Sequence, residues 1–247
     1  MRRLWPDPGE VDDIAALVAA EARPAPADRP WVLVNMVASL DGAITIAERS
    51  GGLGGPADKA MFAALRGIAD VVLVGAGTAR AERYGPARPS EAIRAARRAR
   101  GQHEVPQIAL VTRSLDLDLS TPLFTEAERP SIVITCASAD PHRQAAAAEV
   151  AELVVAGDDA VDLPAALAAL RTADAEVVTC EGGPTLNGDL IAADLIDEWA
   201  LTAAPLLVGG DAGRGSRSRH PADPRAMRLD RLLESDHYLL ERWVRAR

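Results

Sequence analysis

Two short apolar runs, each followed at once by a glycine turn, constrain the fold of this 247-residue chain more than any other feature. Residues 71–74 lead into a turn at 75–78, and residues 177–180 lead into a turn at 181–186. A short apolar run bounded by such a turn is typical of a strand covered on both faces. Because a helix start suits the residues after each turn, the two segments predict β–α units of a largely parallel sheet.

The same alternation runs through most of the chain. Apolar, β-branched segments predict further strands at 31–37, 108–112, 132–136, 199–208 and 238–244. Amphipathic or Ala-rich segments predict helices at 11–21, 56–69, 90–100, 141–150, 163–172 and 184–193. The last two strands have no helix between them and are expected to pair antiparallel. The pattern predicts an α/β fold with a mixed, mostly parallel sheet flanked by helices and antiparallel C-terminal strands.

The length suits a single α/β domain. A Pro-rich stretch at 23–26 separates the first predicted helix from the first predicted strand, so residues 1–30 are interpreted as an N-terminal helix and linker. Residues 31–247 are then the single domain. A long polar loop at 209–224 is either functional or disordered, and the sequence leaves both readings open.

Charge and hydropathy exclude several classes of partner. A net charge of -9 repels nucleic-acid phosphates, so a nucleic-acid partner is not expected. The basic start is followed by Trp5 and Pro6 rather than an apolar stretch, which argues against a signal peptide. No apolar run approaches the ~20 residues of a membrane span. We expect a cytoplasmic protein with no membrane partner.

The cysteines and histidines indicate no metal site. Cys136 and Cys180 each end an apolar run and are expected to be buried thiols. The four histidines are scattered and show no metal-ligand spacing, so no metal is assigned.

Each glycine turn has the chemistry of a phosphate cradle. Glycines let a phosphate approach the backbone, and the helix start behind them offers free N–H groups and a positive dipole end. The first turn is not a dinucleotide-binding fingerprint, because Arg80 stands where the third glycine is needed. Alone, each turn is equally well a plain β–α turn, and Pro184 suits an ordinary first helical position. Two such turns at strand ends predict a shared crevice for a dinucleotide pyrophosphate.

A third segment bears on the choice of nucleotide. Thr112, Arg113 and Ser114 follow the strand predicted at 108–112. An arginine beside hydroxyls can hold an adenosine 2′-phosphate, which would favour NADPH over NADH. A solvent-facing arginine in a turn is an equal alternative.

Polar residues on the first strand and second helix are further candidates. Asn35 and Ser39 share one face of the predicted strand and are candidates for substrate binding. Asp41 precedes Gly42 and is expected in a turn. The basic helix with Arg94, Arg97, Arg98 and Arg100 is interpreted as a solvated face, with a phosphate-attracting rim as the alternative.

Four motifs together resemble one known family. In chain order they are residues 35–42 (NMVASLDG), 73–78 (LVGAGT), 181–186 (EGGPTL) and 204–210 (APLLVGG). The chain resembles the reductase domain of the bifunctional riboflavin-biosynthesis deaminase-reductase over roughly residues 31–210. Its N-terminal helix looks like that of the stand-alone actinobacterial members of this pyrimidine reductase family.

The resemblance implies a dihydrofolate-reductase-like fold, NADPH as cofactor and a homodimer. It also implies an activity, the reduction of 5-amino-6-(5-phosphoribosylamino)uracil to its ribitylamino form. Hydride would reach the sugar C1′, while the protein supplies orientation and a proton.

The family motifs also imply roles for individual residues. Asp58 matches a proposed catalytic acid, Arg66 a substrate-phosphate ligand and Glu181 a substrate-side carboxylate. Val37 and Glu82 match nucleotide-side positions. With the glycine turns and the 112–114 segment, the expected cofactor-binding set is Val37, Gly75, Gly77, Thr78, Glu82, Thr112, Arg113, Ser114, Gly182, Gly183, Pro184, Thr185 and Leu186.

Asp58 has a competing explanation. It is expected in the first turn of its helix, where the dipole favours any acid and lowers its pKa. A proton donor there needs burial or a neighbouring carboxylate, for which Glu181 is the candidate.

Two departures from the family pattern leave alternatives open. Residues 81–88 (AERYGPAR) replace a family run that helps to hold substrate, and this favours a second hypothesis, a pterin reductase of dihydrofolate-reductase type. The zinc motif of the deaminase domain is absent from the sequence, so deamination is excluded. A third hypothesis is a nucleotide-binding module without catalysis.

Overall fold

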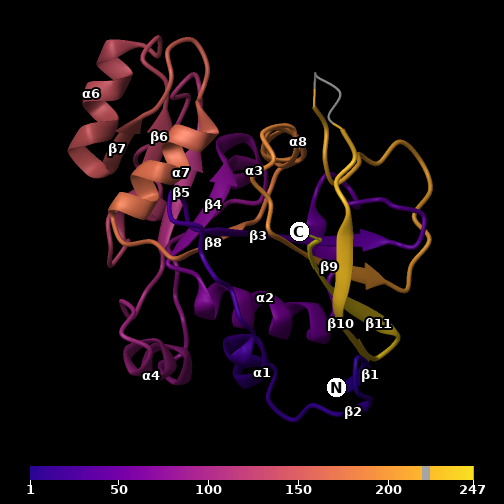
Figure 1. Cartoon of the computed structure of the whole chain (residues 1–247). Helices are drawn as coiled ribbons and strands as arrows, with labels where there is room; N and C mark the ends of the chain where they lie inside the picture. The colour runs from indigo at the N-terminus through magenta and orange to yellow at the C-terminus, as the bar shows by residue number, and fades with distance from the viewer. Residues whose placement is uncertain (219–222, 247) are drawn as a thin grey trace.

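A computed structural model describes residues 1–218 and 223–246. Its described strands form one sheet in the order β2-β1-β10-β11-β9-β3-β8-β4-β5-β6-β7, with helices on both faces (Figure 1). The strands are β1 Arg2–Trp5, β2 Gly9–Glu10, β3 Trp31–Ser39, β4 Val71–Gly75, β5 Gln107–Val111, β6 Ile132–Thr135, β7 Glu152–Val155, β8 Val177–Cys180, β9 Glu198–Ala204, β10 Met227–Ser235 and β11 Tyr238–Arg245.

The sheet has a parallel half and an antiparallel half. From β9 through β3, β8, β4, β5 and β6 to β7, every neighbouring pair is parallel. From β9 through β11, β10 and β1 to β2, every pair is antiparallel. The predicted fold class, including the antiparallel C-terminal pairing of β9 with β11, is confirmed.

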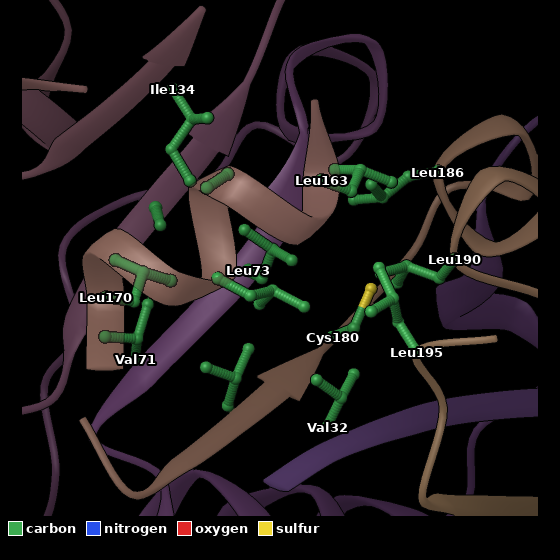
Figure 2. Packing of buried hydrophobic residues seen from close by; sticks show 14 of the residues in the cluster. Val32, Val71, Leu73, Ile134, Leu163, Leu170, Cys180, Leu186, Leu190 and Leu195 are labelled. Carbon is green, nitrogen blue, oxygen red and sulfur yellow. The ribbon is translucent and has the colours of Figure 1, made fainter. Parts of the chain in front are cut away.

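The helices divide between the two faces of the sheet. They are α1 Ile14–Ala20, α2 Pro56–Ile68, α3 Ala76–Ala81, α4 Glu91–Ala99, α5 Pro122–Thr125, α6 Pro141–Val150, α7 Leu163–Thr172 and α8 Pro184–Ala192, with a short 3-10 helix at Ser50–Gly52. Helices α1 and α2 pack beneath β3, β9, β10 and β11 in one apolar cluster. Helices α7 and α8 cover the opposite face of β3, β8 and β4 (Figure 2).

The alternation of side chains along β8 decides which face each following residue serves. Val178 and Cys180 point into the cluster beneath α7 and α8, where Figure 2 shows Cys180 near Leu190 and Leu195. Thr179 points the other way, and its hydroxyl donates to the carbonyl oxygen of Leu65 on α2 at 3.4 Å. The next residue on that second face is Glu181, so the strand directs its carboxylate toward α2.

Several elements differ from the sequence expectation. The strand predicted at 199–208 ends at Ala204. Strands β1, β2, β7 and β10 were not predicted, because the first three have four residues or fewer and adjacent charged residues at Asp230 and Arg231 interrupt the apolar alternation of β10. Strand β1 pairs with β10, so the N-terminal segment contributes to the sheet as well as a helix.

On the basic helix α4, Arg98 and Arg100 are exposed, as the solvated-face interpretation expects, whereas Arg97 is a correction. Arg97 is fully buried, and its guanidinium donates to the carbonyl oxygens of Gly67, Ala69 and His103 at 2.5–3.1 Å. It therefore caps the C-terminal end of α2 and is neither solvated nor part of a phosphate-attracting rim. Burial lowers the pKa of this guanidinium to about 10. Both cysteines are free and buried, as predicted.

Candidate active site

The two glycine turns lie side by side at the C-terminal ends of β4 and β8. The backbone N–H of Gly75 donates to the carbonyl oxygen of Gly182 at 2.8 Å. Beside this bond a groove of about 620 Å³ runs between α3, α8 and the start of α7, the region at the top centre of Figure 1. Its lining residues are Gly75, Ala76, Gly77, Thr78, Val111, Thr112, Arg113, Ala160, Val161, Leu163, Gly183, Pro184, Thr185, Leu186 and Asp189.

Glycine is required where the turns meet. A Cβ on Gly183 would overlap the Thr78 hydroxyl, and Gly182 has a φ of +87°, in the left-handed region that favours glycine. A Cβ on Gly75 would lie 3.6 Å from the backbone N of Gly183, an ordinary van der Waals contact. The requirement for glycine at this junction therefore rests on Gly182 and Gly183.

The groove contains the N-terminal end of α8. Its N-cap, Gly183, offers no side-chain hydrogen bond to the first turn, and Pro184 occupies the first helical position. The first N–H groups of a helix have no partner within the helix and suit an anion. Helix α3 begins in the same way after Gly75. The groove therefore presents backbone donors from two directions.

The segment after β5 forms a third wall. Arg113 is exposed, lines the groove and has no hydrogen-bond or ion-pair partner among the described residues. The Thr112 hydroxyl already accepts from the N–H of Leu115 at 3.1 Å. The Ser114 hydroxyl accepts from the N–H of Asp116 at 3.4 Å, and Ser114 is not among the lining residues. Of this predicted trio, the structure leaves Arg113 free for a ligand.

A second cluster lies on the α2 face of the sheet. Nε and Nη2 of Arg66 donate to the two carboxylate oxygens of Glu181, each at 2.6 Å. The Tyr84 hydroxyl donates to Oε2 of Glu181 at 2.7 Å. Burial acts to lower the pKa of Arg66, but the Glu181 carboxylate outweighs it and raises that pKa. Burial, then Glu181, raises the pKa of Tyr84 well above 10.0.

Asp58 lies in the first turn of α2, half-buried. Burial raises its pKa from 3.8, against the opposing effects of a hydrogen bond with Thr202 and the charge of Lys59. The expected lowering by the helix dipole is therefore outweighed. The neighbour that the structure places beside Asp58 is Thr202 on β9, in place of the suggested Glu181.

Two candidates on β3 flank Asp58. Val37 pairs in register with Thr202, the hydrogen-bond partner of Asp58. Asn35 pairs with Ala200, two residues earlier on the same strand face. Both side chains are half-buried. Val37, expected beside the nucleotide, lies on the α2 face and not among the residues that line the groove.

Ser39 and Glu82 are engaged within the protein. The Ser39 hydroxyl donates to Oδ1 of Asp41 at 2.5 Å and accepts from the N–H of Ala43 at 2.9 Å. Asp41 lies in a turn, as predicted. Oε1 of Glu82 accepts from the N–H of Ser50 at 2.8 Å. These bonds hold loops around the site and leave the two side chains less available to a ligand.

The long polar loop is anchored beside the groove. Asp41 accepts hydrogen bonds from the N–H groups of Val208 and Gly209, the latter at 2.7 Å. Nδ2 of Asn187 on α8 donates to the carbonyl oxygen of Gly215 at 2.8 Å.

The same loop touches the first turn of α8. The N–H of Arg217 donates to the carbonyl oxygen of Pro184 at 2.7 Å. A Cβ on Gly188 would overlap the backbone of Arg217, so glycine permits this close passage. Residues 219–222 of the loop lie outside the described residues.

Three site residues were not found from the sequence. They are Tyr84, Thr202 and Asn187. Each forms a hydrogen bond with a residue distant in the chain, and no local sequence pattern identifies such a pair. A weak signal existed for Tyr84, one of only two tyrosines and part of the unusual 81–88 run.

Among the described residues, no group of three or more His, Cys, Asp or Glu side chains could hold a metal ion. Among the same residues, no helix has the length and apolar character to cross a membrane.

Fold and groove together define an α/β protein with a mixed sheet and a ligand groove at the C-terminal ends of its parallel strands. The RibD C-terminal domain family matches residues 30–237, and the chain belongs to this family. The family predicted from the four motifs is thus confirmed.

Named sequence relatives and similar solved structures agree with this family assignment. The chain is 32% identical over 189 residues to the 2,5-diamino-6-ribosylamino-4(3H)-pyrimidinone 5′-phosphate reductase of Methanothermobacter thermautotrophicus, covering 75% of this chain and 82% of that protein. The enzyme of the same name from Archaeoglobus fulgidus is 30% identical over 183 residues, covering 74% and 83%. A pyrimidine reductase-like protein from Corynebacterium diphtheriae superposes with a TM-score of 0.83 at 26% identity, covering 94% and 99%. The yeast riboflavin biosynthesis reductase Rib7 shares the fold, with a TM-score of 0.65 at 17% identity and coverage of 90% and 92%.

Proposed function

We propose that this protein is an NADPH-dependent reductase that converts a ribosylaminopyrimidine 5′-phosphate to its ribitylamino form. The observation that carries the proposal is the Gly75–Gly182 hydrogen bond, which joins two phosphate-cradle turns into one groove. A dinucleotide is the ligand class that needs two such cradles at the carboxyl ends of parallel strands.

The groove fits the cofactor in three parts. The free N–H groups at the start of α8 suit the pyrophosphate. Arg113, free of protein partners among the described residues, suits the 2′-phosphate that distinguishes NADPH from NADH. The bound nicotinamide would supply the hydride. Gly77, Thr78, Thr185 and Leu186 would shape the walls between these ends.

The substrate belongs on the α2 face. Arg66 and Glu181 would bind its polar groups, with Asn35 on the neighbouring strand. Asp58 is proposed to hold a proton for the developing amine, because burial raises its pKa and favours the protonated carboxyl. Glu181 follows β8 and is itself followed directly by Gly182 and Gly183. The carboxylate proposed to bind substrate is therefore adjacent in the chain to the turn proposed to bind the cofactor.

Two pyrimidines are candidate substrates. The original hypothesis names 5-amino-6-(5-phosphoribosylamino)uracil, whereas the archaeal relatives are named for the 2,5-diamino-4(3H)-pyrimidinone compound. The two compounds differ in the substituent on the pyrimidine ring and share the ribosylamino phosphate that is reduced. A pterin substrate, suggested by the 81–88 loop, lacks the phosphate that Arg66 is expected to meet.

The quaternary state and location also remain proposals. Trp199 and Leu201 on β9 and Leu239 and Trp243 on β11 lie half-buried on the sheet face opposite α2. Glu241 lies among them and accepts a hydrogen bond from Nε1 of Trp243 at 2.6 Å. This largely apolar face supports the proposed homodimer. The acidic net charge supports a protein without nucleic-acid partners, and we propose a cytoplasmic location.

The test is loss of nicotinamide absorbance with purified protein, NADPH and each substrate in turn. We expect turnover with one or both ribosylaminopyrimidine phosphates and none with dihydrofolate. Turnover of dihydrofolate alone would establish the pterin reductase. NADPH binding without any turnover would establish the nucleotide-binding module.

A further inference from the structure

Tyr84 completes the set of hydrogen bonds around the Glu181 carboxylate. The tyrosine hydroxyl and Nη2 of Arg66 both donate to Oε2, and Nε of Arg66 donates to Oε1. An ionised carboxylate accepts at about four lone-pair positions. Three are therefore filled by the protein, and the remaining acceptor position is on Oε1 of a side chain that is only 3% exposed.

Arg66 is held on two further sides. Its guanidinium carbon lies 4.4 Å from the centre of the Phe62 ring and 5.5 Å from the centre of the Tyr84 ring. Its Nη1 group makes no hydrogen bond to any described residue, and 24% of the side chain is exposed. The guanidinium is therefore fixed by its inner edge and both aromatic neighbours, while its outer edge is available to a ligand.

The backbone after α3 places the Tyr84 hydroxyl within hydrogen-bond distance of Glu181. Helix α3 begins at the first cofactor turn and ends at Ala81. Arg83 then adopts a left-handed conformation with φ of 55°, and the N–H of Tyr84 donates to the carbonyl oxygen of Ala79 at 2.8 Å. The Tyr84 ring packs against an apolar cluster that includes Leu115. The Tyr84–Glu181 bond thus connects the helix of the first turn to the residue that opens the second.

We propose that Tyr84 is a positioning residue for substrate: its hydroxyl fixes Glu181 so that the open position on Oε1 and the outer edge of Arg66 face the substrate together. The inference rests on the proposed function for the identity of the substrate. The pair of open groups, one acceptor and one double donor, fits a substrate that presents a hydroxyl or N–H beside a phosphate oxygen. Tyr84 lies in the 81–88 run, outside the four motifs on which the family resemblance rests.

The first experiment uses Tyr84→Phe, which removes the hydroxyl and keeps the ring. We expect KM for the ribosylaminopyrimidine phosphate to rise about tenfold, as for a lost hydrogen bond to a charged group. KM for NADPH should stay unchanged, because Tyr84 is not among the residues that line the cofactor groove. The control is Ser131→Ala, which removes a buried hydroxyl bonded to the carbonyl oxygen of Leu123, away from both clusters. The control should change neither KM.

A double-mutant cycle shows whether Tyr84 acts through Glu181. In a Glu181→Gln background, Tyr84→Phe should change kcat/KM by less than about twofold, because the carboxylate it positions is gone. Equal effects of Tyr84→Phe in both backgrounds would overturn the proposal. So would an unchanged substrate KM in the folded single variant, or an equal rise in both KM values.

A measurement without turnover separates this inference from the proposed function. The Nε–H signal of Arg66 in a nitrogen-edited NMR spectrum reports the ion pair directly. We expect Tyr84→Phe to shift or broaden that signal, and Ser131→Ala to leave it in place. If wild-type protein reduced neither pyrimidine, the proposed function would fail. A titration with ribose 5-phosphate, followed by the Arg66 signal, would still test whether Tyr84 positions Glu181 and Arg66 for a ligand. An Arg66 signal and ribose 5-phosphate affinity unaltered by Tyr84→Phe would refute the positioning role.

Discussion

Gly183 and Thr78 occupy neighbouring space so closely that a Cβ on the glycine would overlap the threonine hydroxyl. The two residues belong to turns about a hundred positions apart in the chain. Both residues line the groove, and their contact brings the starts of α3 and α8 together. A ligand in the groove therefore has both turns within reach.

Gly77→Ala tests whether a phosphate approaches the first turn. A Cβ on Gly77 would have no protein atom within 4 Å, and the residue is helical, so the variant should fold and gain up to about 1 kcal/mol of stability. NADPH affinity should nevertheless fall about tenfold, because the new methyl group stands in the phosphate's path. Calorimetric titration measures this. Gly9→Ala, which also has open space but lies on β2, is the matched control.

Arg113→Gln tests the choice of nucleotide. Loss of a charge-assisted bond to the 2′-phosphate should raise KM for NADPH about 10- to 100-fold. KM for NADH, which lacks this phosphate, should hardly change. Steady-state kinetics with both cofactors gives the ratio. A similar rise for both would remove Arg113 from the 2′-phosphate site.

Asp58→Asn tests the proton donor. Turnover should fall at least about tenfold, while KM for NADPH is retained. Because the protonated form of Asp58 is the active one, wild-type kcat should decline as pH rises through its raised pKa. The pH profile of the variant's residual kcat should lack this decline. A variant with wild-type turnover would eliminate Asp58 as the donor.

The hydrogen bonds of Asp41 to the backbone of Val208 and Gly209 are predicted to be lost in acid. Hydrogen bonds from Ser39, Gly209 and Val208 lower the pKa of Asp41 to about 2. A lowered folded-state pKa contributes stability above the unfolded value of 3.8, and that contribution is lost as pH falls toward about 2. The amide NMR signals of Val208 and Gly209 in the folded protein should therefore titrate with a midpoint at about 2, the folded-state pKa of Asp41. Asp41→Asn should abolish the titration, and amides that move instead near neutral pH would contradict the assignment.

Much of the fold could be predicted because its signals are local. Apolar runs ending in glycine identified β4 and β8, and helices α6 and α7 begin and end where the sequence placed them. Strand β10 could not be found in this way, because the adjacent charges of Asp230 and Arg231 interrupt its apolar alternation, and Arg231 is buried in an ion pair with the distant Glu21. The burial of Arg97 was equally hidden, since its carbonyl partners belong to another helix and loop.

For the site, too, local features could be predicted from the sequence and long-range contacts could not. The cofactor groove followed from two motifs, each readable within a few residues. The substrate side depends on pairs such as Tyr84 and Glu181, which are 97 positions apart, or Asp58 and Thr202, on a helix and a distant strand. Such pairs come into contact only through the topology of the sheet.

The most direct test of the account is a crystal structure of the protein soaked with NADPH. The pyrophosphate should lie between the turns at 75–78 and 182–186, within hydrogen-bond distance of the first N–H groups of α8. The 2′-phosphate should lie beside Arg113, and the nicotinamide should point toward the face that carries Asp58 and Glu181. A cofactor bound elsewhere, or a pyrophosphate that touches only one of the two turns, would contradict the account.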